Sequence, residues 1–139
     1  MKRELANVKS FEIGQESHGI LTFMVQFDLE SGGCQGMGNI SLDRWSPADN
    51  RRVGTSAGMD LIIRMFDFFG ISSTNDLKKV IGTTVYVLRA SDRWNEPIIG
   101  METTGFASGG KKFFVVDEWM ARWKGEPLAP PPAAKGSAE

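Results

Sequence analysis

Two arginines lie in otherwise apolar stretches of the sequence: Arg64 lies within an apolar segment, and Arg89 ends a run of apolar and β-branched residues. Arginine carries a planar fork of donors that suits phosphate oxygens, and its flat guanidinium group stacks on an adenine ring. This pair therefore predicts contacts to a small phosphate-bearing ligand. The side chains nearby in sequence or in flanking loops that would stack against its base are Trp45, Trp94, Met65 and Phe69.

A plainer interpretation of Arg64 is an ion pair within its own helix, because Asp60 and Asp67 lie four residues before it and three after it. Both interpretations stay open. The two aspartates are about 10 Å apart along a helix axis, which is too far for carboxylates that act on one bond. The adjacent Glu16 and His18 fit a hydrogen-bonded turn better than a proton relay. We expect no catalytic residue and no enzyme.

The glycine-rich stretch Gly32–Gly38 contains a G-x-G pattern at Gly36-Met37-Gly38. It lacks the third glycine of a dinucleotide loop, and strand-like alternation follows it instead of the helix that would face a pyrophosphate. Glycines within a strand mark a bulge or a place where another group approaches the backbone closely. The stretch thus predicts either a structural hairpin or a strand that contacts the ligand.

The composition of the 139-residue chain excludes several classes of protein. One cysteine, Cys34, and one histidine are too few for a disulfide framework or a zinc site, and they fit a reducing cytoplasm. The net charge of −1 gives no broad positive field for a nucleic-acid duplex. No segment approaches the ~20 apolar residues of a membrane span. We expect no cofactor, no metal, no duplex nucleic acid and no membrane partner.

Alternation of apolar and polar residues over Gly19–Glu30 predicts a strand that buries one face. An earlier strand over Val8–Ile13 would pair with it through a polar turn at Gly14–His18. Arg44–Val53 resembles a loop, and Thr74 begins a helical turn that ends near Gly82. The remaining predicted elements are strands over Gln35–Asp43, Thr83–Ala90, Pro97–Thr104 and Lys111–Val116, and a final helix over Asp117–Lys124.

The helix predicted over Ser56–Phe69 is apolar on nearly every side, with Thr55 or Ser56 as its N-cap and Gly70 at its end. Such a helix needs cover on two sides, which predicts a homo-oligomer, a dimer or a multiple of dimers. The fold class is therefore α+β, a mainly antiparallel sheet packed on one long apolar helix, with further short helices. We expect one domain over residues 1–124 and a disordered Pro/Ala-rich tail over residues 125–139.

Four sequence blocks resemble a family of small phage and prophage proteins. Ser17-His18-Gly19-Ile20-Leu21 is similar to the family's D-H-G-I-L, and QGMGNISLD at Gln35–Asp43 is similar to Q-G-x-G-G-Y-x-L-D. Gly54–Met65 resembles G-T-x-x-G-x-x-x-I-x-R-I, and Ile71–Leu77 resembles G-V-x-x-W-E-D-L ahead of a strand that ends in arginine. Departures from these patterns include Asn39, Ile40, Thr74 and Asn75, and the segment Lys79–Gly82 is longer than the pattern allows.

The family resembled is that of the anti-Thoeris sponges, which implies a binder of cyclic ADP-ribose-type signals made by bacterial TIR enzymes. The resemblance predicts a non-enzymatic immune-evasion protein that sequesters a cyclic nucleotide in the host cytoplasm. Arg64, Arg89 and Asn75 would contact its phosphates and ribose in a pocket that a second subunit completes. The other predicted ligand-binding residues are Gly36, Met37, Gly38, Met65 and Phe69.

Two rival functions follow from the same residues. A protein–protein inhibitor of the anti-CRISPR type would occlude a host nuclease, although a nearly neutral chain is a poor mimic of nucleic acid. A hydrolase that cleaves the signal would need a metal cluster or a nucleophile motif, and the sequence contains neither. Sequestration therefore remains the leading prediction.

Overall fold

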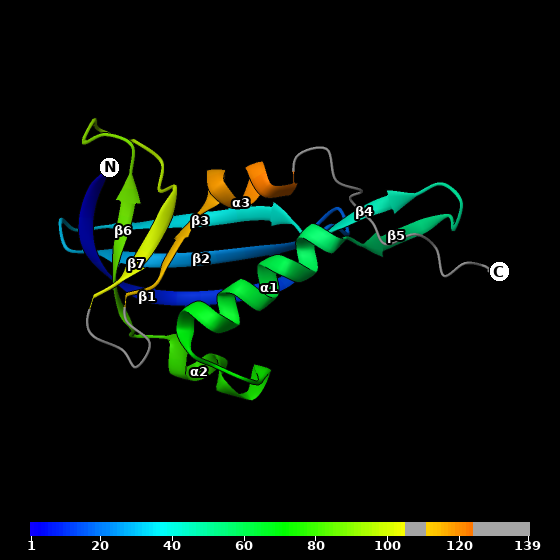
Figure 1. The fold of residues 1–139 in the computed structure, drawn as a ribbon, viewed down its shortest axis with the longest axis horizontal. Coiled ribbons are helices and arrows are strands. Elements are labelled where there is room, and N and C mark those ends of the chain that lie inside the picture. Colours follow the sequence, from blue (N-terminus) through cyan, green and yellow to red (C-terminus); the bar gives the residue numbers. More distant parts are fainter. Residues whose placement is uncertain (105–110, 124–139) are drawn as a thin grey trace.

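A six-stranded antiparallel sheet, with strand order β3-β2-β1-β6-β7-β8, forms the centre of the protein (Figure 1). The computed structural model describes residues 1–104 and 111–123. Its strands are β1 (Lys2–Gln15), β2 (Leu21–Leu29), β3 (Cys34–Ser41), β4 (Asp43–Ser46), β5 (Arg51–Gly54), β6 (Thr84–Arg89), β7 (Gly100–Thr103) and β8 (Phe113–Val115). Its helices are α1 (Ser56–Phe69), η1 (Thr74–Asp76), α2 (Leu77–Val80) and α3 (Val116–Trp123). The predicted mixture of α and β elements with a mainly antiparallel sheet is confirmed.

The alternation predicted for β2 is present, because Phe23, Val25 and Phe27 are all buried on one face of the sheet. Burying such side chains contributes about 1.5–3 kcal/mol each before entropy is subtracted. β1 is longer than the predicted Val8–Ile13, since its second half pairs with β2 while its first half pairs with β6. One continuous strand therefore joins the two halves of the sheet.

Helix α1 has the predicted bounds and lies obliquely to β1, β2 and β3 in Figure 1. The Thr55 side chain accepts a hydrogen bond from the Gly58 N–H group at 2.8 Å, and Gly70 ends the helix in the left-handed conformation at φ 66°. The helix residues that are buried are Ala57, Gly58, Leu61, Met65 and Phe68.

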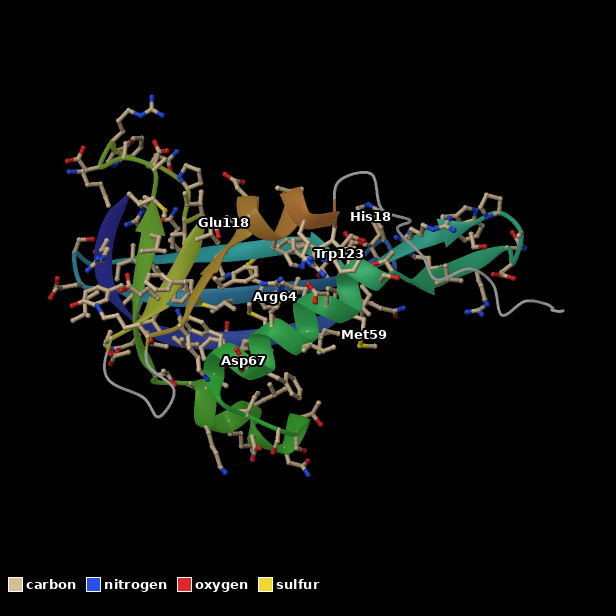
Figure 2. All side chains as sticks on the ribbon, in the orientation of Figure 1. His18, Met59, Arg64, Asp67, Glu118 and Trp123 are labelled. Carbon is tan, nitrogen blue, oxygen red and sulfur yellow. The ribbon has the colours of Figure 1, made fainter. Side chains whose placement is uncertain are left out.

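The structure does not support the prediction of a long apolar helix. Helix α1 has 14 residues and is amphipathic, because its outer face carries Arg64 and Asp67 as well as apolar side chains. Met59 and Ile63, one turn apart on that face, are each 59% exposed. Figure 2 shows Met59 on the outer side of the helix. Residues 1–104 and 111–123 thus bury one face of α1, and Met59 and Ile63 are exposed on the other.

Helix α3 packs beside α1 on the same side of the sheet. Its Trp119 is buried, and the Trp123 indole N–H donates to the Asp60 carboxylate of α1 at 3.0 Å. Asp117 and Glu118 occupy the first turn of α3, where negative charge interacts favourably with the helix dipole. This confirms a short final helix, which begins one residue earlier than predicted.

The prediction of a loop over Arg44–Val53 is wrong, because β4 and β5 form an antiparallel hairpin there. Trp45 faces Arg52 across the two strands, and the Arg52 guanidinium pairs with Asp43 at 2.8 Å. Figure 1 shows the hairpin extending beyond the end of the six-stranded sheet. Each strand has only four residues, so alternation over so short a run gives no clear pattern.

β7 begins at Gly100 instead of Pro97, and the predicted turn at Thr74–Gly82 forms η1 and α2. The predicted tail at residues 125–139 lies outside the described residues. Within residues 1–104 and 111–123, no helix has the length and hydropathy to span a membrane.

Replacement of Gly58 by alanine tests the packing of α1 against the chain that precedes it. An added Cβ would lie 2.3 Å from the Leu42 carbonyl oxygen, a backbone atom that cannot rotate away. We expect G58A to lower the free energy of unfolding by about 1–3 kcal/mol, as overpacking does. A Cβ at Gly54 would have no atom within 4 Å, so G54A serves as the control in urea denaturation. Equal effects of the two substitutions would contradict this account.

Candidate functional site

A cleft of about 600 Å³ opens at the end of the molecule opposite the β4–β5 hairpin. The start of β1, the start of β3, the end of β6 and the loop between β6 and β7 surround it, and Figure 1 shows this loop beside the N-terminus. The cleft residues that matter most below are Lys2, Glu4, Gln35, Arg89, Arg93 and Trp94. The volume lies within the range of pockets that hold small ligands and cofactors.

Arg89 forms the floor of this cleft and is largely buried, with a side chain that is 13% exposed. Its Nη1 donates to the Glu4 carboxylate at 2.9 Å, and its Nη2 donates to the Gln35 side-chain oxygen at 2.8 Å. Its Nε donates to the backbone carbonyl of Glu96 at 3.2 Å. The three nitrogens of the guanidinium group therefore join β1, β3 and the β6–β7 loop.

Strand register places these groups together. Val87 and Phe27 are buried on the face of the sheet that carries the core. Glu4 lies opposite Val87 and Gln35 lies opposite Phe27, so both side chains point to this face. Arg89 is two residues beyond Val87 in β6 and therefore points to the same face. At the Arg89 end of the sheet, the buried apolar side chains of this face give way to the hydrogen-bonded network of Arg89, Glu4 and Gln35. The sequence pattern around Arg89 does not show its partners, because Gln35 and Glu4 are 54 and 85 positions away.

Glu4 is the anionic partner in this network. Its second carboxylate oxygen accepts a hydrogen bond from the Ser31 N–H group at 2.8 Å. Burial alone would raise the pKa of Glu4, but the hydrogen bonds from Ser31 and Arg89 outweigh it and lower the pKa below the ordinary value. Glu4 is therefore charged at neutral pH and holds Arg89 in place.

The loop between β6 and β7 forms the outer wall of the cleft. The Glu96 carbonyl accepts hydrogen bonds from both Arg89 and Gln35, the latter through Nε2 at 3.2 Å. At the tip of this anchored loop, Trp94 is 94% exposed and Arg93 is 80% exposed. An exposed indole and an exposed guanidinium group on a fixed loop are suited to stacking on a base and to binding an anion.

Among the predicted ligand-binding residues, Arg89 lines the cleft and Arg64 does not. Arg64 forms the alternative ion pair with Asp60 at 2.8 Å, and Figure 2 shows it on α1 with Trp123 of α3 nearby. Asp67 instead forms an ion pair with Lys112, whose ammonium nitrogen lies 3.9 Å from the Asp67 carboxylate. The structure thus confirms the intrahelical Arg64–Asp60 pair.

Met37 and Met65 are core residues, with almost no exposed surface, so neither side chain reaches a surface ligand in this conformation. Phe69 is partly buried and packs edge-on against Phe11, with ring centres 5.6 Å apart. Asn75 lies exposed in η1, where its N–H group donates to the Ser73 hydroxyl. The structure does not bring these four residues into the cleft.

The glycines of β3 have a structural explanation. Gly38 adopts φ 130°, and a Cβ there would lie 2.6 Å from the Phe23 carbonyl oxygen at a bulge between β2 and β3. A Cβ at Gly36 would approach the Met24 sulfur to 2.9 Å. The sheet therefore requires glycine at position 38, whereas a side chain at position 36 would meet only side-chain atoms that can move. The close backbone approach at Gly38 favours the structural hairpin over a strand that contacts a ligand.

Two of the remaining sequence candidates lie outside the cleft. His18 pairs with Glu16 at 3.0 Å in the β1–β2 turn, which raises the pKa of His18 and lowers that of Glu16. Trp45 lies on the β4–β5 hairpin. In the described part of the chain, no three His, Cys, Asp or Glu side chains converge in a way that could hold a metal ion.

Sequence reasoning missed Glu4, Gln35, Arg93 and Glu96 as members of the site. Gln35 begins the block QGMGNISLD, so its position was visible while its role was not. The polarity of the Ser91–Glu96 run indicated only a loop. No protein-family profile, no curated protein and no solved structure matches this chain significantly.

Substitution of Arg89 by glutamine tests the network that forms the cleft floor. The change leaves Glu4 without its cationic partner, and we expect the free energy of unfolding at pH 7 to fall by about 1–3 kcal/mol. Because Arg89 helps to lower the pKa of Glu4, its contribution is present above the ordinary value of 4.5 and is lost as pH falls through the lowered pKa. The difference from wild type should therefore shrink at pH 3.

The matched control is R93Q, since Arg93 is also paired with a glutamate but is mostly exposed. Because the Arg93 side chain is 80% exposed and that of Arg89 is 13% exposed, and because Glu96 keeps its hydrogen bond from Ser91, R93Q should change stability less than R89Q. Urea denaturation of both variants at pH 7 and pH 3 measures these differences. A pH-independent loss in R89Q would show that its effect does not pass through Glu4.

Proposed function

We propose that the protein binds a small cyclic nucleotide in the cleft beside Arg89 and sequesters it without degrading it. The observation that carries this proposal is the β6–β7 loop, which is anchored at the Glu96 carbonyl and carries Trp94 and Arg93 at the mouth of a cleft large enough for a nucleotide. The indole would stack on the base, while Arg93 and Lys2 would meet the phosphates. Arg89 would lie beneath the ligand, where its hydrogen bonds connect the β6–β7 loop to Glu4 and Gln35.

The proposed role is binding without turnover. The cleft contains guanidinium groups, an indole and carboxylates, of which Glu4 and Glu96 are paired with arginine. The guanidinium groups and the indole would hold an anion and a ring, and they supply no activated nucleophile. Slow release would make such a protein an effective sponge for a signalling molecule. The resemblance to the anti-Thoeris proteins supports a cyclic ADP-ribose isomer or a cyclic oligonucleotide as the ligand, and the host cytoplasm as the place of action.

We further propose that a second copy of the chain covers the outer face of α1. The exposed Met59 and Ile63 supply adjacent apolar surface on this helix. Association of two such faces would remove four large apolar side chains from water at about 25 cal/mol per Å² buried. A dimer, or a multiple of dimers, would then present several clefts.

A second candidate function rests on the same exposed apolar face. A protein–protein inhibitor, such as one that occludes a host defence nuclease, would use Met59 and Ile63 to contact its target. In that case a stoichiometric host protein would co-purify with the chain. A nucleotide released intact on heating, detected by mass spectrometry, would favour sequestration instead.

Removal of the Trp94 side chain tests ligand binding in the cleft. Titration calorimetry with cyclic ADP-ribose isomers and cyclic trinucleotides should show binding to the wild type, with the ligand recovered intact after denaturation. Loss of one stacking contact worth about 1–3 kcal/mol should weaken binding in W94A by about 5- to 150-fold. Trp45, half-exposed on the distant hairpin, provides the control W45A, which should bind as the wild type does. Absence of binding to the folded wild type at micromolar ligand would refute the proposal.

Placing a charge on the outer face of α1 tests the proposed association. The substitution I63D should convert the oligomer to monomer, because a carboxylate in an apolar interface is costly to desolvate. Ile81 is similarly exposed but lies after α2, so I81D should leave the mass unchanged. Light scattering coupled to gel filtration gives the mass of each protein. If the wild type is a monomer at about 100 µM, the proposed association through α1 is wrong.

A further inference from the structure

Arg93, the one cationic residue that the structure shows at the tip of the β6–β7 loop, is already bound to a carboxylate of the same loop. One oxygen of Glu96 accepts hydrogen bonds from the Arg93 Nε at 3.1 Å and from its Nη2 at 2.9 Å. The same oxygen accepts the Ser91 hydroxyl at 3.0 Å. Two nitrogens of the guanidinium group, which suit a phosphate, are therefore directed at an internal anion.

The two partners of this ion pair differ in their freedom to move. Glu96 is held by its backbone carbonyl, which Arg89 and Gln35 bind, and by Ser91, and its side chain is only 10% exposed. The Arg93 side chain is 80% exposed, and Glu96 is the one partner that the structure shows for its guanidinium group, while the Arg93 backbone N–H donates to the Ser91 hydroxyl at 3.3 Å. The glutamate is thus fixed, whereas the arginine is free to exchange one anion for another.

Exchange at this position would cost little. The Arg93 side chain is 80% exposed, so solvent screens its attraction to Glu96, and a phosphate with two negative oxygens can offer it a stronger partner. The hydrogen bond from Ser91 remains on Glu96 after Arg93 leaves, so the carboxylate keeps a donor. The loop backbone also keeps its anchors on Arg89 and Gln35.

We infer that Glu96 is an internal competitor of the ligand: its carboxylate occupies Arg93 in the free protein, and an anionic oxygen of the ligand replaces it on binding. This inference deepens the proposed function, because it concerns the same cleft. It makes Glu96 a specificity-determining residue, since only a ligand with an anionic group at this position can displace it. A neutral nucleoside would leave the internal pair intact.

The substitution E96Q tests the inference with pyrophosphate as the probe. Glutamine keeps the shape of the side chain and an oxygen for Ser91 but removes the charge that competes for Arg93. Removal of the competing charge should tighten pyrophosphate binding by about two- to fivefold. The Arg93 Nε–H signal in ¹⁵N-correlated NMR spectra should shift on addition of pyrophosphate to the wild type, and it should already be shifted in free E96Q.

The control is D92N, which removes a negative charge from an exposed position in the same loop. If D92N tightens binding as much as E96Q does, the effect is general electrostatics and the inference is overturned. It is also overturned if pyrophosphate moves no cleft signal, or moves other cleft signals but not that of Arg93. The nucleotide titrations fail or succeed separately, so a protein that binds pyrophosphate at Arg93 but no cyclic nucleotide would refute the proposed function alone.

Discussion

The buried guanidinium group of Arg89 is the constraint on which the arrangement of the cleft depends. A charge removed from water must find partners in the protein, and Arg89 finds them in Glu4, Gln35 and the Glu96 carbonyl. These three groups belong to β1, β3 and the β6–β7 loop. Their shared need for one cation fixes the end of the sheet and the loop that forms the outer wall of the cleft.

This network also explains how an exposed loop can present a defined surface. Loops that lack internal contacts are mobile, and side chains at their tips lose entropy when a ligand orders them. Here the Glu96 carbonyl is bound from two sides, so the tip that carries Arg93 and Trp94 rests on a fixed base. A preorganised loop loses less freedom on binding, which favours affinity.

The cleft and the outer face of α1 are separate surfaces with different chemistry. The cleft is charged, with arginines that are matched by carboxylates, whereas the exposed part of α1 places Met59 and Ile63 in solvent. We propose a small polar ligand for the first surface and a protein, either a second copy or another partner, for the second. Asp60 links α1 to α3, because its carboxylate pairs with Arg64 and accepts the Trp123 indole N–H.

Local pattern alone determined much of the fold. Alternation over Leu21–Leu29, the Thr55 and Gly70 caps and the β-branched run before Arg89 each predicted an element that the structure contains. These signals are short-range, since burial of one face and capping of a helix leave a periodic trace in neighbouring residues. The β4–β5 hairpin left no such trace in its four-residue strands.

Only the tertiary structure decided which residues share a site. Arg64 and Arg89 look alike in sequence, yet Arg64 pairs within its helix and Arg89 joins the distant strands β1 and β3 to the adjoining β6–β7 loop. Because apolar residues occur on nearly every side of α1, the sequence pattern did not show whether Met65 faces the core or the surface, and in the structure it is buried. The partners of a buried charge come from strand register and loop anchoring, which act between residues far apart in the chain, so no local pattern contains them.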